Sequence, residues 1–275
     1  MSLSILNNLS SLTAENNLDA TQTNLQSTLT QLSSGSKINS GADDPAGLSI
    51  ANGLTANISA LTQSVQNATN GTGLLQTADG ALSQVTTLLN SAVTLAQEAS
   101  SSGLTTAQSS AIQSDYTAIL AQITNINSTT NFNGTAVFGN AGSVYLGDGT
   151  STGSYSVSTA ATAVDPTADL KLSAAATALT TTGSAQTELT AITAAIATVA
   201  QDRGTIGAAV NQLTAATNVM NTQIQNLTSA ESGISDADIG KTVANMSKFS
   251  TLEQTGIAAL QQANQSSQTI LKLIQ

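Results

Sequence analysis

The 275-residue chain offers few side chains suited to catalysis. It contains no histidine and no cysteine, which excludes triads with a histidine base and zinc sites built from these residues. One motif with catalytic spacing remains: "SGSK", from Ser34 to Lys37, has the Ser-x-x-Lys pattern of serine acyl-enzymes. No Ser-Asp-Asn or Lys-Thr-Gly motif follows it. In a sequence this rich in serine, we interpret the motif as part of a loop between helices.

A glycine-rich stretch, "GDGTSTG" from Gly147 to Gly153, has the composition of a calcium loop. Calcium takes about 6 to 8 oxygen ligands, and the single carboxylate of Asp148 supplies too few of them. A hairpin turn is the better interpretation. The sequence therefore predicts no metal site, no cofactor and no enzyme activity.

The composition limits the classes of partner. The net charge is −10, and the six basic residues are scattered along the chain, so no basic stripe exists to neutralise nucleic-acid phosphates. No positive segment precedes an apolar run at the amino terminus, and no run reaches about 18 apolar residues; we expect neither a Sec-type signal peptide nor membrane insertion. Aromatic residues are only 2% of the chain, so burial must come from small aliphatic side chains, which favour long helix-to-helix contacts.

The first 33 residues carry a narrow apolar seam. Leu18, Leu25 and Leu32 recur every seven positions and Leu29 fills an intermediate step, which is typical of a coiled-coil helix. The other faces are mostly uncharged and polar, so few ion pairs support this helix. It should be marginally stable by itself in water.

Apolar residues at three-and-four spacing predict further long helices. One is expected from about Ala46 to Ser100, despite the glycines of "NGTG" at residues 70–73. The next follows Thr105 and Gln108, which have capping-box spacing. Another contains a seam from Leu189 to Leu227, and the pattern then breaks at "SAESGISDADIG". The last runs from about 236 to 274.

Between these helices the sequence changes to glycine, serine and short β-type runs, with Asn133-Gly134 as a hairpin signal. The expected fold is mainly α: an elongated antiparallel helical bundle or coiled coil of paired N- and C-terminal helices, with a small β-hairpin region at the tip. The predicted organisation is terminal helices at 1–33 and 236–275, linkers at 34–45 and 228–235, a rod of long helices at 46–130 and 180–227, and a hairpin tip at 131–179.

The first linker has local chemistry that favours a helix start. Asp44 precedes Pro45, and a residue before proline is pushed out of the α region, as an N-cap requires. Pro45 suits the first helical position, and Asp43 and Asp44 bring negative charge to the positive end of the helix dipole.

Five segments closely resemble, in order and spacing, the two conserved terminal regions of bacterial flagellin. They are "LSSGSKINSGADDPAGLSIA" (32–51), "TNFNG" (130–134), "RGTIGAAVNQL" (203–213), "SAESGISDAD" (229–238) and "LQQANQSSQTILKLI" (260–274). The resemblance covers roughly residues 1–135 and 185–275. Only about fifty residues separate the two parts, so the variable surface domain of many flagellins looks missing, and the chain resembles a minimal flagellin.

The resemblance implies a structural subunit that polymerises into the extracellular flagellar filament for swimming motility, after export in an unfolded state by the flagellar type III apparatus. The terminal helices would form the inner tube of the filament and become ordered on assembly, with the linkers as spokes to the rod. Implied partners are copies of the same chain, hook-associated junction and cap proteins, and an export chaperone at the C-terminal region. The expected polymer-interface residues are Leu18, Leu25, Leu29, Leu32, Met246, Phe249, Leu260, Ala263, Ile270, Leu271 and Ile274.

The chain departs from the family at several charged positions. Flagellins often carry arginine where Gln212, Gly233 and Ser235 stand here, so packing between subunits should depend less on ion pairs. Arg203 remains, and we interpret it as one member of a structural ion pair whose carboxylate the sequence does not identify.

The segment that animal Toll-like receptors sense in some flagellins also differs. Ser91 and Thr94 replace the usual arginine and glutamate, whereas Leu95 and Asp115 are similar in type. We expect this surface, with Ser91, Leu95 and Asp115, to bind an innate immune receptor only weakly.

Two alternative functions remain open at this stage. A hook-filament junction protein would share the terminal helices, although the short middle of the chain and the strong match at "ANQSSQTILKLI" argue against it. A secreted helical binding module would instead use a site in the hairpin region.

Overall fold

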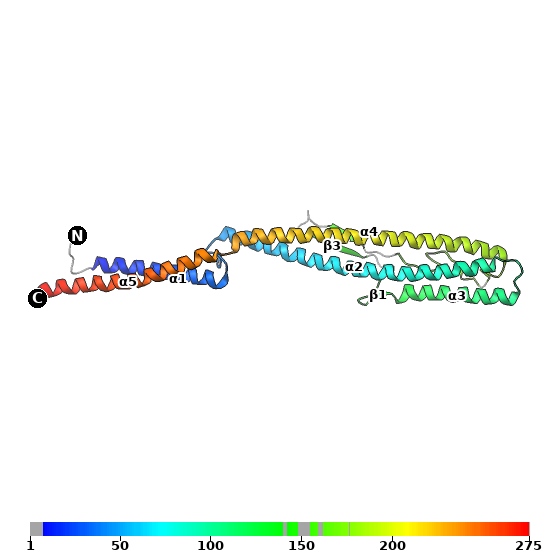
Figure 1. Ribbon diagram of the computed structural model, residues 1–275, viewed down its shortest axis with the longest axis horizontal. Coiled ribbons are helices and arrows are strands. Elements are labelled where there is room, and N and C mark those ends of the chain that lie inside the picture. Colours follow the sequence, from blue (N-terminus) through cyan, green and yellow to red (C-terminus); the bar gives the residue numbers. More distant parts are fainter. Residues whose placement is uncertain (1–7, 140–141, 148–154, 159–161, 176, 275) are drawn as a thin grey trace. The chain divides into compact units, whose positions relative to one another are not determined.

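The computed structural model describes residues 8–139, 142–147, 155–158, 162–175 and 177–274. Its elements are α1 (Leu9–Ser34), α2 (Pro45–Ala99), α3 (Thr106–Thr129), β1 (Asn131–Phe132), β2 (Thr135–Ala136), β3 (Ser143–Leu146), β4 (Tyr155–Ser158), α4 (Thr182–Ser235) and α5 (Ile239–Ile274). The fold is mainly α, as predicted (Figure 1). Contacts divide the chain into a terminal unit, residues 1–56 and 226–275, and a central unit, residues 57–225.

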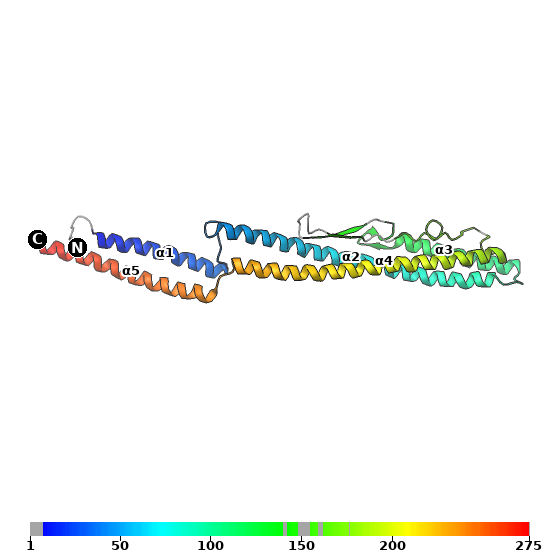
Figure 2. The same cartoon turned by 90° about the horizontal axis from the view of Figure 1, so that it is seen from above.

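The central unit contains most of the buried side chains. Its parts of α2 and α4 run side by side, with α3 along them (Figure 2). The buried positions recur at the expected steps of three and four and are almost all aliphatic: Leu61, Ala68, Leu75, Ala78, Leu82, Val85, Leu89, Ala92, Ala96, Ile112, Leu120, Ile123, Ile192, Ala195, Val199, Ile206, Leu213 and Met220. Small side chains at the same depth as leucines let long helices approach closely over their whole length.

Two details of the predicted helices are wrong. The residues expected to form the second linker, 228–235, are helical, and α4 continues to Ser235. This segment contains no proline, and the break falls at residues 236–238, where Asp238 Oδ1 accepts a hydrogen bond from Lys241 N (3.1 Å) at the start of α5. The inner seam of α4 also begins at Ala185 and Glu188, whereas Leu189 is only half-buried.

Local signals at the ends of α3 are confirmed. Thr105 and Gln108 form a capping box in which each side chain bonds the other residue's backbone N–H. Asn133 and Gly134 have φ values of 51° and 78°, and they join β1 to β2 with Phe132 opposite Thr135, as a two-residue turn with positive φ requires.

The second hairpin pairs β3 with β4, with Val144 opposite Val157. It is attached to α2 through Ser64, a buried hydroxyl that donates to Gly147 O (2.8 Å) and accepts from Gly147 N (3.2 Å). One side chain thus satisfies both backbone groups of Gly147, which would otherwise be buried without partners.

A glycine in the middle of α2 makes room for the first hairpin. A Cβ atom added at Gly73 would lie 3.3 Å from the ring of Phe132, whereas a Cβ at Gly80, two turns further on, meets nothing within 4 Å. The helix therefore passes through "NGTG" without a break, and the contact with Phe132 gives the reason for a glycine at position 73.

This difference predicts that alanine substitution changes stability differently at the two glycines. Gly80→Ala should stabilise the central unit by about 1 kcal/mol, because alanine loses less conformational entropy in a helix. Gly73→Ala gains the same propensity but must displace the Phe132 ring, so we expect its free energy of unfolding to fall at least about 1 kcal/mol below that of Gly80→Ala. Urea unfolding of the two variants measures the difference, and equal stabilisation by both would contradict the packing argument.

Candidate assembly surface

The terminal unit pairs α1 with α5 in an antiparallel arrangement. Leu18 faces Gly256, where an added Cβ would lie 3.3 Å from Leu18 Cδ1. Polar contacts fix the same register: Ser11 Oγ donates to Asn264 Oδ1 (3.0 Å) and Asn8 Nδ2 to the carbonyl of Ala263 (3.2 Å). The two helices contact each other along a seam that repeats every seven residues.

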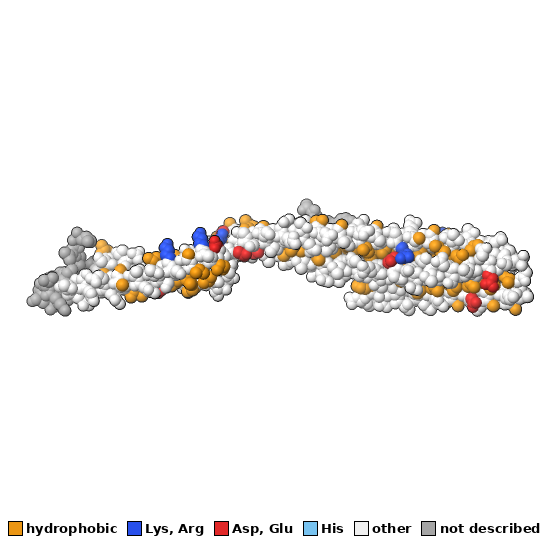
Figure 3. Space-filling view, viewed as in Figure 1, with side chains coloured by type: hydrophobic (Ala, Val, Ile, Leu, Met, Phe, Trp, Pro, Cys, Tyr) orange, Lys and Arg blue, Asp and Glu red, His pale blue; other side chains and the backbone are white. Residues whose placement is uncertain are grey.

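This unit leaves an unusual amount of apolar surface exposed. Among its described residues the buried apolar side chains are Ile38 and Ala51, both near the joint. Long apolar side chains are instead exposed, with 72% of Leu9, 55% of Leu12 and 47% of Leu29 accessible. Figure 3 shows apolar side chains, in orange, on the surface of this unit. The other exposed large apolar side chains of this unit are those of Ile50, Ile239, Val243, Leu252 and Ile257.

A groove on one side of the helix pair extends this surface. It is lined by Leu9, Ala14 and Leu18 from α1 and by Phe249, Leu252 and Gly256 from α5, with threonine and asparagine side chains between them. A pair of helices by itself cannot cover both the seam and these outer faces. Apolar surface of this kind, rimmed by polar residues, is typical of a protein-protein contact.

The predicted interface residues divide between the seam and the outside. Half-buried against the facing helix are Leu18, Leu25, Leu32, Met246, Phe249, Leu260 and Ala263. Leu29 faces outward, and the side chains of Ile270, Leu271 and Ile274 lie outside those that the structure describes. Sequence reasoning missed the exposed Leu9, Leu12 and Ile257, because it sought a single seam on each helix.

The joint between α1 and α2 is held by a backbone bridge to the end of α4. Lys37 N donates to Ser235 O (2.6 Å), and Ala237 N donates to Gly35 O (2.9 Å). Gly35 has φ 72°, the left-handed conformation that commonly ends a helix. The segment that follows α1 and the segment that precedes α5 are therefore bonded to each other.

The acidic residues of the joint organise its backbone. Asp44 Oδ1 accepts a hydrogen bond from Gly47 N (2.9 Å) at the start of α2, whose first residue is Pro45. Asp43 Oδ2 accepts from the backbone of Asn39 (3.0 Å) and Ser40 (2.8 Å). These donors lower the pKa of Asp43, because they favour its charged form.

The catalytic reading of "SGSK" finds no support at this joint. Ser34 Oγ lies against backbone groups, 3.4 Å from Gln31 O and 3.1 Å from Ser36 N. Within the described part of the chain no group of three acidic residues could hold a metal ion, and no helix is long and apolar enough to span a bilayer. Most of the "GDGTSTG" stretch, residues 148–153, lies outside the described residues.

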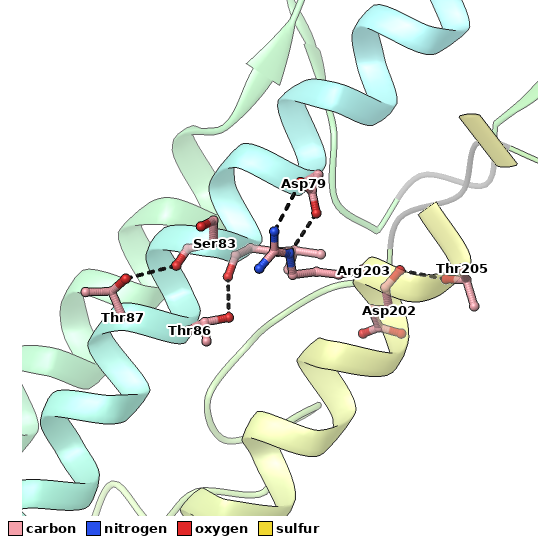
Figure 4. A network of polar contacts seen from close by, with 8 residues as sticks. Asp79, Ser83, Thr86, Thr87, Asp202, Arg203 and Thr205 are labelled. Carbon is pink, nitrogen blue, oxygen red and sulfur yellow. Dashed lines mark hydrogen bonds and ion pairs between the residues drawn. The ribbon is translucent and has the colours of Figure 1, made fainter. Parts of the chain in front are cut away.

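In the central unit, Arg203 on α4 forms an ion pair with Asp79 on α2 (Figure 4). Arg203 Nε donates to Asp79 Oδ1 (2.7 Å) and Nη2 to Oδ2 (3.2 Å), and this hydrogen bonding raises the pKa of the guanidinium above its usual value. Both side chains are more than a third exposed, so the pair contributes at most about 1 kcal/mol and mainly sets the register of α2 on α4.

A second polar cluster, which sequence reasoning missed, is buried in the central unit. Glu188 on α4 is 5% exposed; its Oε1 accepts hydrogen bonds from Tyr116 Oη on α3 and from Ser173 N (2.8 Å). Burial, and then the bond to Glu188, raise the pKa of Tyr116, so the phenol remains a proton donor.

Gln113, one turn before Tyr116, completes the cluster. Its side chain accepts from Leu179 N (2.7 Å) and donates to Ala175 O (3.1 Å). Glu188 and Gln113 thus hold the irregular segment before α4 against the helices. The sequence offered one sign of this buried cluster: Glu188 is three residues after Ala185 and four before Ile192, so a glutamate occupies a position of the apolar seam.

The residues expected at an immune-receptor surface lie on α2 and α3 of the central unit. Ser91 and Asp115 are exposed and Leu95 is half-buried. Ser91 Oγ donates to Thr87 O (3.2 Å) within its own helix.

Comparison with known proteins gives a consistent picture. Residues 5–143 match the family model described as the bacterial flagellin N-terminal helical region, and residues 189–274 match that of the C-terminal helical region. A flagellin of Halalkalibacterium halodurans is 31% identical over 98% of this chain and 99% of its own length. A flagellin of Serratia marcescens is 42% identical over 46% of this chain, but only 36% of that longer protein is covered.

Among solved structures, the crystal structure of Bacillus cereus flagellin has a TM-score of 0.49 and 23% identity, covering 60% of this chain and 94% of that one. The two family matches leave only residues 144–188 between them. The H. halodurans flagellin aligns over 99% of its own length, so it is almost the same length as this chain. With both conserved terminal regions present, joined by this short middle, the chain belongs to the bacterial flagellin family.

Proposed function

We propose that this chain is the structural subunit of a bacterial flagellar filament and that its terminal unit is the main contact between subunits. One observation carries the proposal: α1 and α5 expose long apolar side chains on faces that neither helix can cover. Fully burying a leucine or isoleucine side chain contributes about 1.5–3 kcal/mol. Copies of the chain packed around a common axis would bury these faces, so the polymer is the stable state.

The organisation proposed for the polymer is the one that membership of the flagellin family implies. The terminal helices line an inner tube, the joint near Asp43, Asp44 and Pro45 acts as a spoke, and the central unit forms the next layer. The interface includes the eleven residues predicted above together with the exposed Leu9, Leu12 and Ile257. Arg203 belongs to the internal structure of the rod and not to this interface.

Further roles are proposed on the basis of family membership. The chain would leave the cell in an unfolded state through the flagellar type III apparatus, bind an export chaperone through its C-terminal region, and meet junction and cap proteins at the two ends of the filament. Binding of an innate immune receptor at Ser91, Leu95 and Asp115 would be weak, and the filament would serve swimming motility.

Concentration-dependent assembly tests the proposed function. Purified protein, seeded with sheared fragments and raised stepwise in concentration, should form filaments above a threshold, seen by electron microscopy and by sedimentation. A variant that lacks residues 1–40 and 240–275 loses α1 and α5; it should stay helical and soluble but not polymerise. Full-length protein that remains monomeric at every concentration would refute the proposal.

A further inference from the structure

The two helices of the terminal unit carry charges of opposite sign. α1 contains two acidic residues, Glu15 and Asp19, and no basic residue, whereas α5 contains Lys241, Lys248 and Lys272 with Glu253 as its one carboxylate. In a chain with only six basic residues in total, half of them lie on this one helix. Glu15 and Asp19, four residues apart, form a negative face on α1, and Lys241 and Lys248, seven residues apart, form a positive face on α5.

Among the described residues these four charges form no ion pair within one copy of the chain, although Asp236 and Asp238 stand just before Lys241 in the sequence. Glu15, Asp19, Lys241 and Lys248 are all exposed, and within the described residues the ion pair that forms is the one between Arg203 and Asp79 in the central unit. The ammonium of Lys248 lies over the ring of Phe249, 5.6 Å from its centroid. Phe249 lines the groove, so Lys248 stands at its rim.

The register of the helix pair explains why the charges do not meet. Leu18 lies opposite Gly256, which puts Glu15 and Asp19 level with residues 255–259 of α5. The lysines lie closer to the joint by about 20 Å along the helix axis, at 1.5 Å per residue. Ion pairs require N–O distances of about 4 Å, so only a second copy, displaced along the helix axis, can bring the two faces together.

Apolar side chains flank both charged faces. Leu12 and Leu29 lie on α1 to either side of the carboxylates, and Leu252 lies one turn beyond Lys248 on α5; all three are exposed. A contact that joins these faces would therefore bury apolar surface around a set of ion pairs. Screening by solvent would be weaker there than on the free surface.

We propose that Glu15 and Asp19 of one copy pair with Lys241 and Lys248 of a neighbouring copy, staggered by about 20 Å along the terminal helices, and that this pairing sets the register between subunits. The inference rests on the proposed function. The contact joins two different faces, so it is heterologous, and contacts of this kind extend into open helical filaments when the rotation does not close. A two-fold contact would produce a dimer instead.

Charge reversal on each face, followed by mixing, tests the pairing. The first variant carries Glu15→Lys and Asp19→Lys; the second carries Lys241→Glu and Lys248→Glu. In each variant the two faces have the same sign, so the critical concentration for seeded polymerisation should rise at least about tenfold above the wild type. In an equimolar mixture every contact between unlike variants is attractive. The mixture should therefore polymerise within about threefold of the wild-type threshold.

The outcomes distinguish this inference from the proposed function. A chain that carries all four reversals restores opposite signs and should also polymerise, and circular dichroism checks that each variant is helical. If the wild type polymerises and the mixture or the fourfold variant does not recover, the pairing is wrong while the proposed function stands. If either double variant polymerises like the wild type, the pairing is likewise wrong. If the wild type never polymerises, both are wrong.

Discussion

Replacing Glu188 with alanine is expected to lower the free energy of unfolding of the central unit by about 3 kcal/mol, because two donors lose their acceptor in a buried site. The phenol of Tyr116 is fully buried and donates a hydrogen bond to Glu188. The backbone N–H of Ser173 donates a second hydrogen bond to the same carboxylate. An unsatisfied buried donor costs about 1–3 kcal/mol. Urea or thermal unfolding of the full chain, followed by circular dichroism, measures the loss.

Two matched variants separate the hydrogen bonds from the packing. Glu188→Gln keeps an oxygen acceptor of nearly the same shape and should cost only about 1 kcal/mol. Tyr116→Phe removes one donor and leaves Ser173 bonded. In the Tyr116→Phe background, Glu188→Ala should cost less than it does in the wild type, which gives a measurable coupling energy. Equal losses for alanine and glutamine at position 188 would show that the cluster contributes through volume alone.

The second large effect is expected in the hydrogen exchange of the terminal helices, α1 and α5. In a dilute monomer, backbone amides of α1 and α5 should exchange with solvent at least about 1,000-fold faster than those around Leu82 and Leu89 in α2, because only deep burial sustains strong protection. α1 buries a single residue, Thr28, among its described positions, whereas Leu82 and Leu89 are at most 1% exposed. Hydrogen exchange read by mass spectrometry resolves the two regions.

Polymerisation should reverse this contrast. Once the terminal faces pack against neighbouring copies, peptides from α1 and α5 should become protected to a similar degree as the core of α2. The central unit serves as an internal control, since its core is buried before assembly and its exchange should change little. Strong protection of α1 and α5 in the dilute monomer would contradict the proposal that assembly is what stabilises them.

Features decided by neighbouring residues could be predicted from the sequence. The capping box of Thr105 and Gln108, the turn at Asn133-Gly134 and the start of α2 at Pro45 depend on contacts within a few positions, and the physics of such short segments is transferable. The apolar seams also follow from a period that the helix itself imposes. One local prediction was wrong, because one glycine and several serines at residues 228–235 do not stop a helix that has a long apolar pattern behind it.

Features decided by where distant segments meet could not be predicted. Asp79 is 124 positions from Arg203, and Tyr116 is 72 positions from Glu188; many carboxylates and hydroxyls would have satisfied the sequence equally well. The outward direction of Leu29 depends on the angle at which α1 meets α5. The sequence by itself determined the helices, the joint and the resemblance to flagellin, because helical period and capping act over one or two turns. Only the tertiary structure decided which faces remain uncovered, because burial depends on the packing of elements that lie far apart along the chain.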